Sequence, residues 1–322
     1  MTDPCVLMLE YLQKLRCADR MDGRVRTAAS NKYVPSSDNF IPFQTFRCNM
    51  PKGKPMITEG NLKLNESLGK IKHVIIVISG KGGVGKSTIS SNLAMSLAMK
   101  GYKTGIMDVD IHGPNIPKMF GVESEVVTVE NDLLVPVTAA HDLKVMSMAF
   151  LIPEKDAPVA WRGPMKAGVI RQFLEDVSWG KLDYLVMDMP PGTGDEALSI
   201  VQLIPKADGM VIVTTPQDVA LLDSRKSIIF STQAKVPIIG LVENMSGFIC
   251  PHCGERTDIF KSGGGEKAAM EMGVRFLGRV PIEPGIVTSG DAGLPIVASA
   301  PESESAKVFD RITELVIKKV EG

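Results

Sequence analysis

The sequence has few cysteines, and it has no long apolar run. Only 5 of the 322 residues are cysteine, and one close pair occurs among them. This odd, scattered set does not form a disulfide framework, which argues against a disulfide-stabilised secreted protein. No stretch approaches the ~20 apolar residues that a transmembrane helix needs. The first residues lack an apolar signal core and include Asp3 and Glu10, which a transit peptide avoids. We therefore expect a cytoplasmic protein.

An excess of charge of either sign is also missing. The 36 Lys and Arg residues nearly balance the 37 Asp and Glu residues, which leaves a formal net charge of −1. The composition therefore gives no support for a nucleic-acid partner and little for a membrane partner. What is present is ordinary for a soluble globular protein, with 44% hydrophobic and 23% charged residues.

The pattern of apolar residues divides the chain at about residue 70. Residues 1–70 lack sustained periodicity apart from an amphipathic segment at 6–15, so we expect a poorly structured N-terminal extension with one short helix. Residues 71–322 form one regular domain. Its predicted strands are 73–79, 104–107, 143–147, 184–187, 210–214, 237–242 and 276–280. Its predicted helices are 87–100, 166–175, 219–231, 265–272 and 303–319.

The alternation of these elements predicts the fold class. Most of the strands are nearly continuous apolar runs, as expected when a strand is buried on both faces of a parallel sheet. Strands that alternate with helices favour an α/β fold, with a doubly wound, mostly parallel sheet and helices on both faces.

A phosphate-binding loop follows the first predicted strand. Residues 80–87 read GKGGVGKS and fit the pattern G-x-x-x-x-G-K-[ST], and the predicted helix 87–100 begins at their end. Main-chain N–H groups of such a loop surround phosphate oxygens, and the helix N-terminus adds partial positive charge. Lys86 is expected to reach the β- and γ-phosphates, and the Ser87 hydroxyl to bind Mg²⁺. The predicted ATP-binding residues are Gly80, Gly82, Gly83, Val84, Gly85, Lys86, Ser87 and Thr88.

Lys81 is a second lysine in this loop, and it is not needed for the phosphates of its own subunit. It resembles the signature lysine of the deviant Walker A class, which includes MinD and ParA. In that class two subunits face each other across two nucleotides, and this lysine reaches the phosphates of the partner. The resemblance implies a homodimer, with Lys81 and Lys86 as catalytic residues.

Acidic residues stand at the ends of two predicted strands. Asp188 occupies the position where a Walker B carboxylate would hold Mg²⁺. Asp108 and Asp110 follow another strand, and the carboxyl ends of parallel strands meet at one edge of the sheet. The resemblance implies that this segment is switch I, with Asp110 orienting the attacking water as a catalytic residue and Asp108 beside the magnesium ion. Asn244 matches the class position that reads the adenine edge.

Cys250 and Cys253 form a CxxC pair just after the sixth predicted strand. Two thiolates on one tight turn can bind one metal ion or two corners of an iron–sulfur cluster, but neither site is complete with two ligands. The chain has no second CxxC, and Cys5, Cys17 and Cys48 fit no compact ligand set. Two chains related by a two-fold axis would supply four cysteines. The two cysteines could bind a cluster shared between two chains, bind a bridging zinc ion, or act as a redox pair.

From about residue 73 onward the chain resembles the Mrp/ApbC family of iron–sulfur cluster carrier ATPases, called Ind-type in mitochondria. The matching stretches are SGKGGVGKS at 79–87, DVDIHGPNIP at 108–117, WRGP at 161–164, DMPPGTGD at 188–195, TPQDV at 215–219, ENM at 243–245 and CPHC at 250–253. The phosphate-binding loop is shared across the whole class. The stretches at 161–164, 188–195 (which would be switch II) and 250–253 are found in far fewer proteins and point to this family. Cys5, Cys17 and Cys48 do not reproduce the N-terminal four-cysteine motif of cytosolic eukaryotic relatives.

The resemblance implies a specific activity. A [4Fe–4S] cluster would be held transiently by Cys250 and Cys253 of two subunits and transferred to apo-proteins, with slow ATP hydrolysis coupled to the transfer. Apo iron–sulfur proteins would be the recipients, and an upstream cluster scaffold is a candidate donor.

Two other functions are compatible with the same nucleotide-binding pattern. A positioning ATPase of the MinD/ParA kind would bind membrane or DNA, and the amphipathic stretch at 303–319 is what a membrane-surface helix would look like. The same stretch is also typical of a terminal helix that packs on the core, which is the interpretation we favour. An electron-transfer reductase like the nitrogenase iron protein is the third possibility.

Overall fold

The computed structural model describes residues 64, 66–111, 113–151, 163–204, 206–250 and 252–322. The chain divides into two units, Met1–Met56 and Ile57–Gly322, and all of the described residues lie in the second. The predicted helix at 6–15, the three scattered cysteines Cys5, Cys17 and Cys48, and Trp161 therefore fall outside the described residues.

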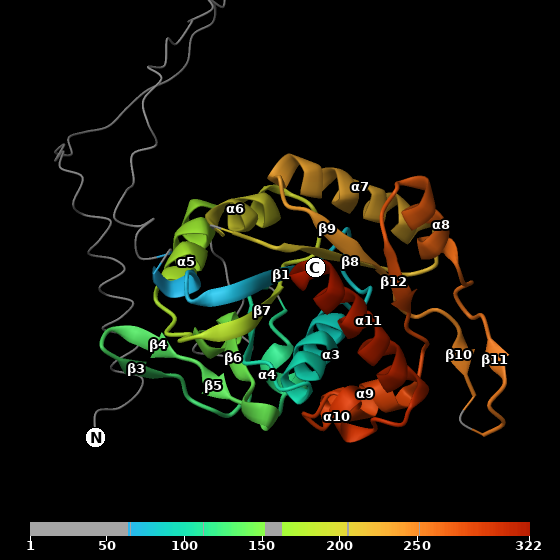
Figure 1. Cartoon of the computed structure of the whole chain (residues 1–322), viewed down its shortest axis with the longest axis horizontal. Helices are drawn as coiled ribbons and strands as arrows, with labels where there is room; N and C mark the ends of the chain where they lie inside the picture. Colours follow the sequence, from blue (N-terminus) through green and yellow to red (C-terminus); the bar gives the residue numbers. More distant parts are fainter. Residues whose placement is uncertain (1–63, 65, 112, 152–162, 205, 251) are drawn as a thin grey trace, which may run out of the picture. The chain divides into compact units, whose positions relative to one another are not determined.

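An eight-stranded sheet forms the centre of the second unit (Figure 1). The strand order is β12-β9-β8-β1-β7-β2-β6-β5, and every neighbouring pair is parallel except β5 with β6. The strands are β1 Ile71–Ser79, β2 Thr104–Asp108, β5 Val137–Thr138, β6 Lys144–Ser147, β7 Leu182–Asp188, β8 Gly209–Thr214, β9 Ile238–Glu243 and β12 Phe276–Arg279. The predicted mostly parallel sheet is confirmed.

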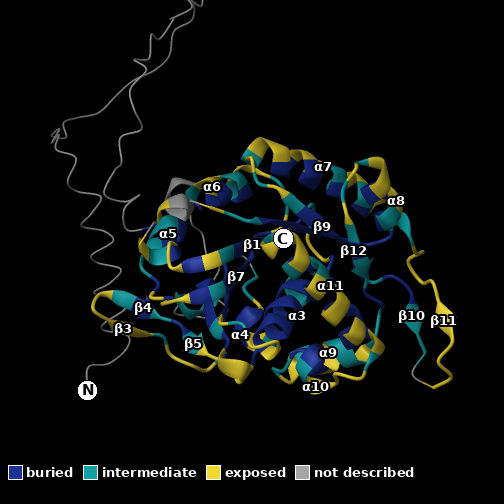
Figure 2. Cartoon of the chain, in the orientation of Figure 1, coloured by how far each residue is buried: buried dark blue, intermediate teal, exposed yellow. Residues whose placement is uncertain are grey.

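The sheet is buried on both faces, which explains the continuous apolar runs. In β1, Ile76 and Ile78 belong to one core cluster while Ile75 and Val77 belong to the other, because successive side chains of a strand point to opposite faces. All four are fully buried. Figure 2 shows the same pattern, with the buried residues concentrated in the central strands.

Helices cover both faces of this sheet. One core cluster contains residues of α5, α6, α7 and α8, and the other contains residues of α3, α4, α10 and α11. The helices are α3 Lys86–Met99, α4 Ile116–Met119, α5 Gly163–Glu175, α6 Asp195–Leu203, α7 Asp218–Ala234, α8 Gly264–Glu271, α9 Pro284–Asp291, α10 Ile296–Ser299 and α11 Glu304–Glu321. The predicted doubly wound α/β class is therefore confirmed.

Helix α11 is packed against the domain. Val308, Phe309, Ile312 and Val316 are buried, and the helix contacts α3, α10 and β12. Tyr184 in β7 donates a hydrogen bond to Glu321 Oε1 at 2.8 Å. The apolar face of the C-terminal stretch is therefore covered by the core, as favoured above. Among the described residues, no helix is both long enough and apolar enough to cross a membrane.

Two small hairpins lie outside the main sheet. Strands β3 Thr128–Glu130 and β4 Leu133–Val135 form one of them. Strands β10 Phe248–Ile249 and β11 Arg256–Thr257 form the other, and the CxxC pair lies between these two strands. Short single-turn helices at Ala140–Asp142 and Met148–Leu151 flank β6.

Candidate nucleotide site and cysteine hairpin

The phosphate-binding loop connects β1 to α3. Gly83 and Gly85 have positive φ angles of 78° and 80°, and Gly85 is the N-cap of α3. A Cβ on Gly85 would lie 2.1 Å from Asn244 Nδ2, so this glycine is required both by its backbone conformation and by its neighbour. Gly80 is equally confined, because its Cβ would lie 2.3 Å from the main-chain oxygen of Asp223. Gly82 and Gly83 are exposed, while Val84 is buried.

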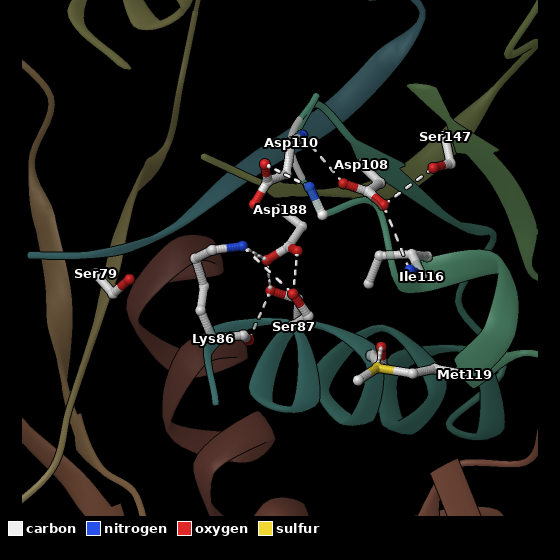
Figure 3. A network of polar contacts seen from close by, with 12 residues as sticks. Ser79, Lys86, Ser87, Asp108, Asp110, Ile116, Met119, Ser147 and Asp188 are labelled. Carbon is white, nitrogen blue, oxygen red and sulfur yellow. Dashed lines mark hydrogen bonds and ion pairs between the residues drawn. The ribbon is translucent and has the colours of Figure 1, made fainter. Parts of the chain in front are cut away.

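Asp188 is the centre of a buried polar network at the end of β7 (Figure 3). Lys86 Nζ lies 2.7 Å from its Oδ1, with only 7% and 1% of the two side chains exposed. The Ser87 hydroxyl donates to Asp188 Oδ2 at 2.7 Å. The Ser90 hydroxyl, one turn further along α3, donates to Oδ1 at 2.6 Å. Thr88 is half-buried in the first turn of α3. The structure therefore brings the predicted phosphate lysine, the magnesium hydroxyl and the Walker B carboxylate together.

Asp108 lies beside this network at the end of β2. The register of β2 on β7 pairs Asp108 with Asp188 directly. Its carboxylate accepts hydrogen bonds from Ser147 Oγ at 3.0 Å, from the Asp110 N–H at 3.1 Å and from the Ile116 N–H at 3.3 Å. Burial, reinforced by the nearby charge of Asp188, raises the pKa of Asp108 to about 8. Asp110 accepts a hydrogen bond from the Gly113 N–H at 3.3 Å.

These oxygens form a suitable donor set for a magnesium ion. A serine hydroxyl and two carboxylates are hard oxygen ligands, which Mg²⁺ prefers to nitrogen or sulfur. Ser87, Asp108 and Asp188 would therefore hold the ion, which would neutralise phosphate charge.

Asn244 and Lys81 are the remaining predicted nucleotide-site residues, one after β9 and one within the loop. Asn244 follows β9 and is 5% exposed. Its Nδ2 donates to the Val84 carbonyl at 2.8 Å, so the side chain contacts the phosphate-binding loop itself. Lys81 is half-buried and forms no ion pair with any residue in the described part of the chain.

The cysteine pair lies at the tip of the hairpin formed by β10 and β11. The Cys250 N–H donates to the Glu255 carbonyl at 2.9 Å, and the Gly254 N–H donates to the Cys250 carbonyl at 2.8 Å. Both thiols are free, and Cys253 is exposed. Hydrogen bonds from the main chain of Cys253 and of His252 lower the pKa of the Cys250 thiol. The hairpin therefore presents two sulfur atoms as candidate ligands and favours the thiolate form of Cys250, which is the form that binds metal.

The metal site formed by one chain is incomplete. No group of three or more His, Cys, Asp or Glu residues placed to hold a metal ion occurs within the described ranges. Within these ranges Cys250 and Cys253 offer two candidate sulfur ligands, and no third residue is placed to complete the set.

A buried carboxylate joins the base of this hairpin to the rest of the domain. Glu243, the last residue of β9, is fully buried. It accepts hydrogen bonds from Ser246 Oγ at 2.5 Å and from the Gly263 N–H at 2.9 Å, and a further one from the Gly265 N–H at the start of α8. Arg279 Nε lies 3.7 Å from the same carboxylate. A buried glutamate at a strand end gives no local sequence signal for this role.

Arg256 in β11 secures the hairpin to the segment after β9. Its guanidinium donates to the Ser246 carbonyl at 3.0 Å. It also fills the space beside Gly247, where a Cβ would lie 2.6 Å from Arg256 Nε. Neither Ser90, Glu243 nor Arg256 was predicted from the sequence.

Comparisons with known proteins place this arrangement in a family. Residues 70–317 match the model of the ParA group described as NUBPL iron-transfer P-loop NTPase. The chain belongs to this family. The predicted resemblance to iron–sulfur carrier ATPases is thereby confirmed, and membership of the iron-transfer P-loop NTPases identifies the protein as a nucleotide hydrolase.

Individual relatives agree with the family match. An iron-sulfur cluster carrier protein of Methanocaldococcus jannaschii is 49% identical over 272 residues, which cover 84% of this chain and 93% of the relative. A cytosolic Fe-S cluster assembly factor, CFD1 of Kluyveromyces lactis, is 50% identical over 232 residues, covering 70% and 82%. Among solved structures, a nucleotide-binding protein of Archaeoglobus fulgidus in complex with ADP aligns with a TM-score of 0.67 at 40% identity. That alignment covers 77% of this chain and 96% of the other.

Proposed function

We propose that this iron-transfer P-loop NTPase carries a [4Fe–4S] cluster between two of its subunits and delivers it to apo-proteins, with slow ATP hydrolysis coupled to the transfer. The observation that carries the proposal is the pair of free thiols on a P-loop domain, with Cys253 exposed and Cys250 half-buried in a turn whose main chain lowers the pKa of the Cys250 thiol. The carrier name of relatives about half identical to this chain supports the same conclusion.

The ligand count supports a homodimer. An iron–sulfur cluster of this type takes four thiolates. The described part of one chain offers two of them, at the tip of the hairpin. A two-fold axis that passes between two hairpins supplies the other two from the same residues of the partner. The cluster is cargo in this scheme, so its site must open for release, and an exposed hairpin tip allows that.

The nucleotide site supplies the energy for the cycle. Lys86 and the loop N–H groups of Gly80 to Ser87 would bind the phosphates of ATP, and Asp110 would orient the attacking water. Lys81, which has no acidic partner in the described part of its own chain, would contact the phosphates of the partner's ATP. Asn244, already in contact with the loop, would bind the adenine edge.

The proposal extends to location and partners. The cytosolic factor among the relatives supports a cytoplasmic protein, with apo iron–sulfur proteins as recipients and an upstream scaffold as donor. The packed helix α11 removes the main support for a MinD-like membrane ATPase, because its apolar side chains are buried in the core. A bridging zinc ion in place of the cluster is the alternative that the cysteine chemistry itself leaves, because zinc also takes four thiolates.

Anaerobic reconstitution of the full chain with iron and sulfide tests the proposal. The wild-type protein should gain about one cluster per two chains, seen as visible absorption and as matching iron and sulfide content. Cys250→Ala/Cys253→Ala should lose that signal, and the loaded wild type should activate an apo iron–sulfur protein.

Cys5→Ala/Cys17→Ala/Cys48→Ala is the control for the loss of cysteines elsewhere and should load normally. Absorption that persists without the CxxC pair would contradict the proposal. So would wild-type protein, purified without oxygen, that contains zinc and accepts no iron.

A further inference from the structure

Four large apolar side chains are exposed close to the phosphate-binding loop and the cysteine hairpin. Val219 and Leu222 on α7 are 65% and 62% exposed, and Ile259 and Phe260 after β11 are 55% and 38% exposed. We call these four residues the apolar patch. Single exposed apolar residues are normal on protein surfaces, whereas a cluster of them beside a functional site marks a contact surface.

The helical register places the α7 half of the patch between the two sites. Asp223 lies four residues after Val219 and shares its side of the helix, and its main chain packs against Gly80, next to Lys81. Asp218 lies four residues before Leu222 and shares that side, and it pairs with Lys261 at 2.7 Å. Val219 therefore lies one turn before the contact of α7 with the phosphate-binding loop, and Leu222 lies one turn after the contact of α7 with the segment that follows the hairpin. Figure 2 shows exposed residues along the outer side of α7.

The other half of the apolar patch belongs to the segment that follows the cysteine hairpin. Ile259 and Phe260 directly precede Lys261, whose ion pair holds this segment against the first turn of α7. Pro216 and Leu221 confirm the contact, because both lie within 3 Å of where a Cβ on Gly264 would stand. The apolar patch thus runs from the phosphate-binding loop toward the hairpin that carries Cys250 and Cys253.

We propose that the apolar patch is covered by a second copy of this chain and forms the apolar centre of the dimer that shares the metal site. This inference rests on the proposed function, because the two-ligand cysteine site is incomplete without a partner copy. An isologous interface brings the same surface of both subunits together, so an apolar patch pairs with itself without unmatched charge. Lys226, Asp218 and Lys261 around it are exposed and would form the polar rim typical of such interfaces.

The experiment compares two double variants of the full chain. Val219→Ser/Leu222→Ser removes the α7 half of the apolar patch. Val126→Ser/Val129→Ser changes two residues that are 63% and 46% exposed, one just before β3 and one within it, on elements other than α7 and the hairpin segment. Oligomeric state is measured by light scattering after size exclusion, across a range of protein concentrations, with Mg²⁺ and a non-hydrolysable ATP analogue.

The dimer dissociation constant of Val219→Ser/Leu222→Ser should rise at least about tenfold, while that of the control should stay at the wild-type value. Both variants should keep the wild-type melting temperature, since the replaced side chains are exposed. If Val219→Ser/Leu222→Ser dimerises as tightly as the wild type, the inference is overturned while the carrier function still stands. If that variant dimerises normally but no longer transfers its cluster, the apolar patch instead binds a client protein. A wild type that never dimerises, even when loaded with iron and sulfide, would overturn the shared site and this inference together.

Discussion

Asp188 receives three side-chain contacts within one buried pocket. Its two oxygens accept from Lys86, Ser87 and Ser90 at 2.6–2.7 Å. A buried carboxylate needs such partners, because an unpaired charge in the interior is strongly unfavourable. Two of the partners belong to the predicted loop motif, but Ser90 does not. Its role becomes visible only once α3 is placed beside β7.

Ser90→Ala should lower the free energy of unfolding by about 1–3 kcal/mol, because it removes a hydrogen bond to a buried charged group. Ser91→Ala is a matched control, since Ser91 is the next residue, is equally buried, and among the described residues donates only to the Met119 sulfur at 3.2 Å. That control should cost less than about 0.5 kcal/mol, because sulfur is a weak acceptor. Chemical denaturation measures both. Equal losses in the two variants would show that Asp188 gains nothing specific from Ser90.

Gly85 and Gly83 allow the contact with Asn244 to be separated from backbone strain. Both have a φ near 80°, but a Cβ would meet Asn244 Nδ2 at 2.1 Å only at Gly85, and nothing within 4 Å at Gly83. Gly83→Ala should cost about 1–2 kcal/mol of stability from the left-handed backbone alone. Gly85→Ala should cost more, and Asn244→Ala should recover part of that excess in the double variant. Thermal denaturation of the wild type, the two single variants Gly85→Ala and Asn244→Ala, and their double variant completes the double-mutant cycle. Additive losses would contradict the contact.

The main elements could be predicted from the sequence because their signals are local. All seven predicted strands occur, with ends that differ by one or two residues, because most of them are nearly continuous apolar runs buried on both faces. The elements that were missed carry weak signals. Helix α6 has only 9 residues and follows a glycine-rich switch, and α9 contains Pro284, Gly285 and Gly290. Two-residue strands such as β10 and β11 are too short to show any period.

In the candidate site too, residues within a contiguous motif could be predicted from the sequence, and residues brought together from distant segments could not. The loop residues and the cysteine pair are contiguous, so their spacing could be recognised. Glu243 is 20 residues from Gly263 in the sequence, and Arg256 contacts Ser246 across the hairpin, so neither contact follows from a local pattern. Such residues can be found only when the topology brings their elements together.

The attachment of α11 can be tested through its end. Tyr184→Phe removes the hydroxyl that donates to Glu321 and should cost about 0.5–1.5 kcal/mol of stability. Tyr102→Phe is the control, because its ring packs edge-on against Tyr184 at 5.0 Å while its hydroxyl has no hydrogen-bond partner within the described chain. It should be nearly neutral in denaturant unfolding. A neutral Tyr184→Phe would mean that the last turn of α11 is not held by this bond.

On the scale of the whole domain, a continuous series of contacts joins the nucleotide site to the cysteine hairpin. Asn244 contacts Val84 in the loop, Ser246 contacts the Glu243 carboxylate, and Arg256 of the hairpin contacts the Ser246 carbonyl. Four consecutive residues, 243–246, thus border the loop, α8 and the hairpin. In the proposed function Asn244 binds the adenine edge, so a change in that contact is expected to reach the hairpin through this segment, which continues directly into β10 and is tied to β11 by Arg256.

Arg256→Met should separate the two activities of the proposed carrier. The substitution keeps an unbranched apolar stem but removes the guanidinium, and with it the hydrogen bond to Ser246 and the exposed ion pair with Asp258. ATP hydrolysis and cluster loading should stay within about twofold of wild type, because neither site uses Arg256 directly. The acceleration of cluster transfer by ATP should fall toward the rate without nucleotide, because the second strand of the hairpin, β11, is no longer tied to Ser246. Arg275→Met, at an exposed arginine that forms no ion pair in the part of the chain described, controls for the lost charge and should keep the full ATP effect. The measurement is the rate of apo-acceptor activation with and without ATP. A normal ATP effect in Arg256→Met would show that the signal reaches the cysteines by another route, such as the dimer interface itself.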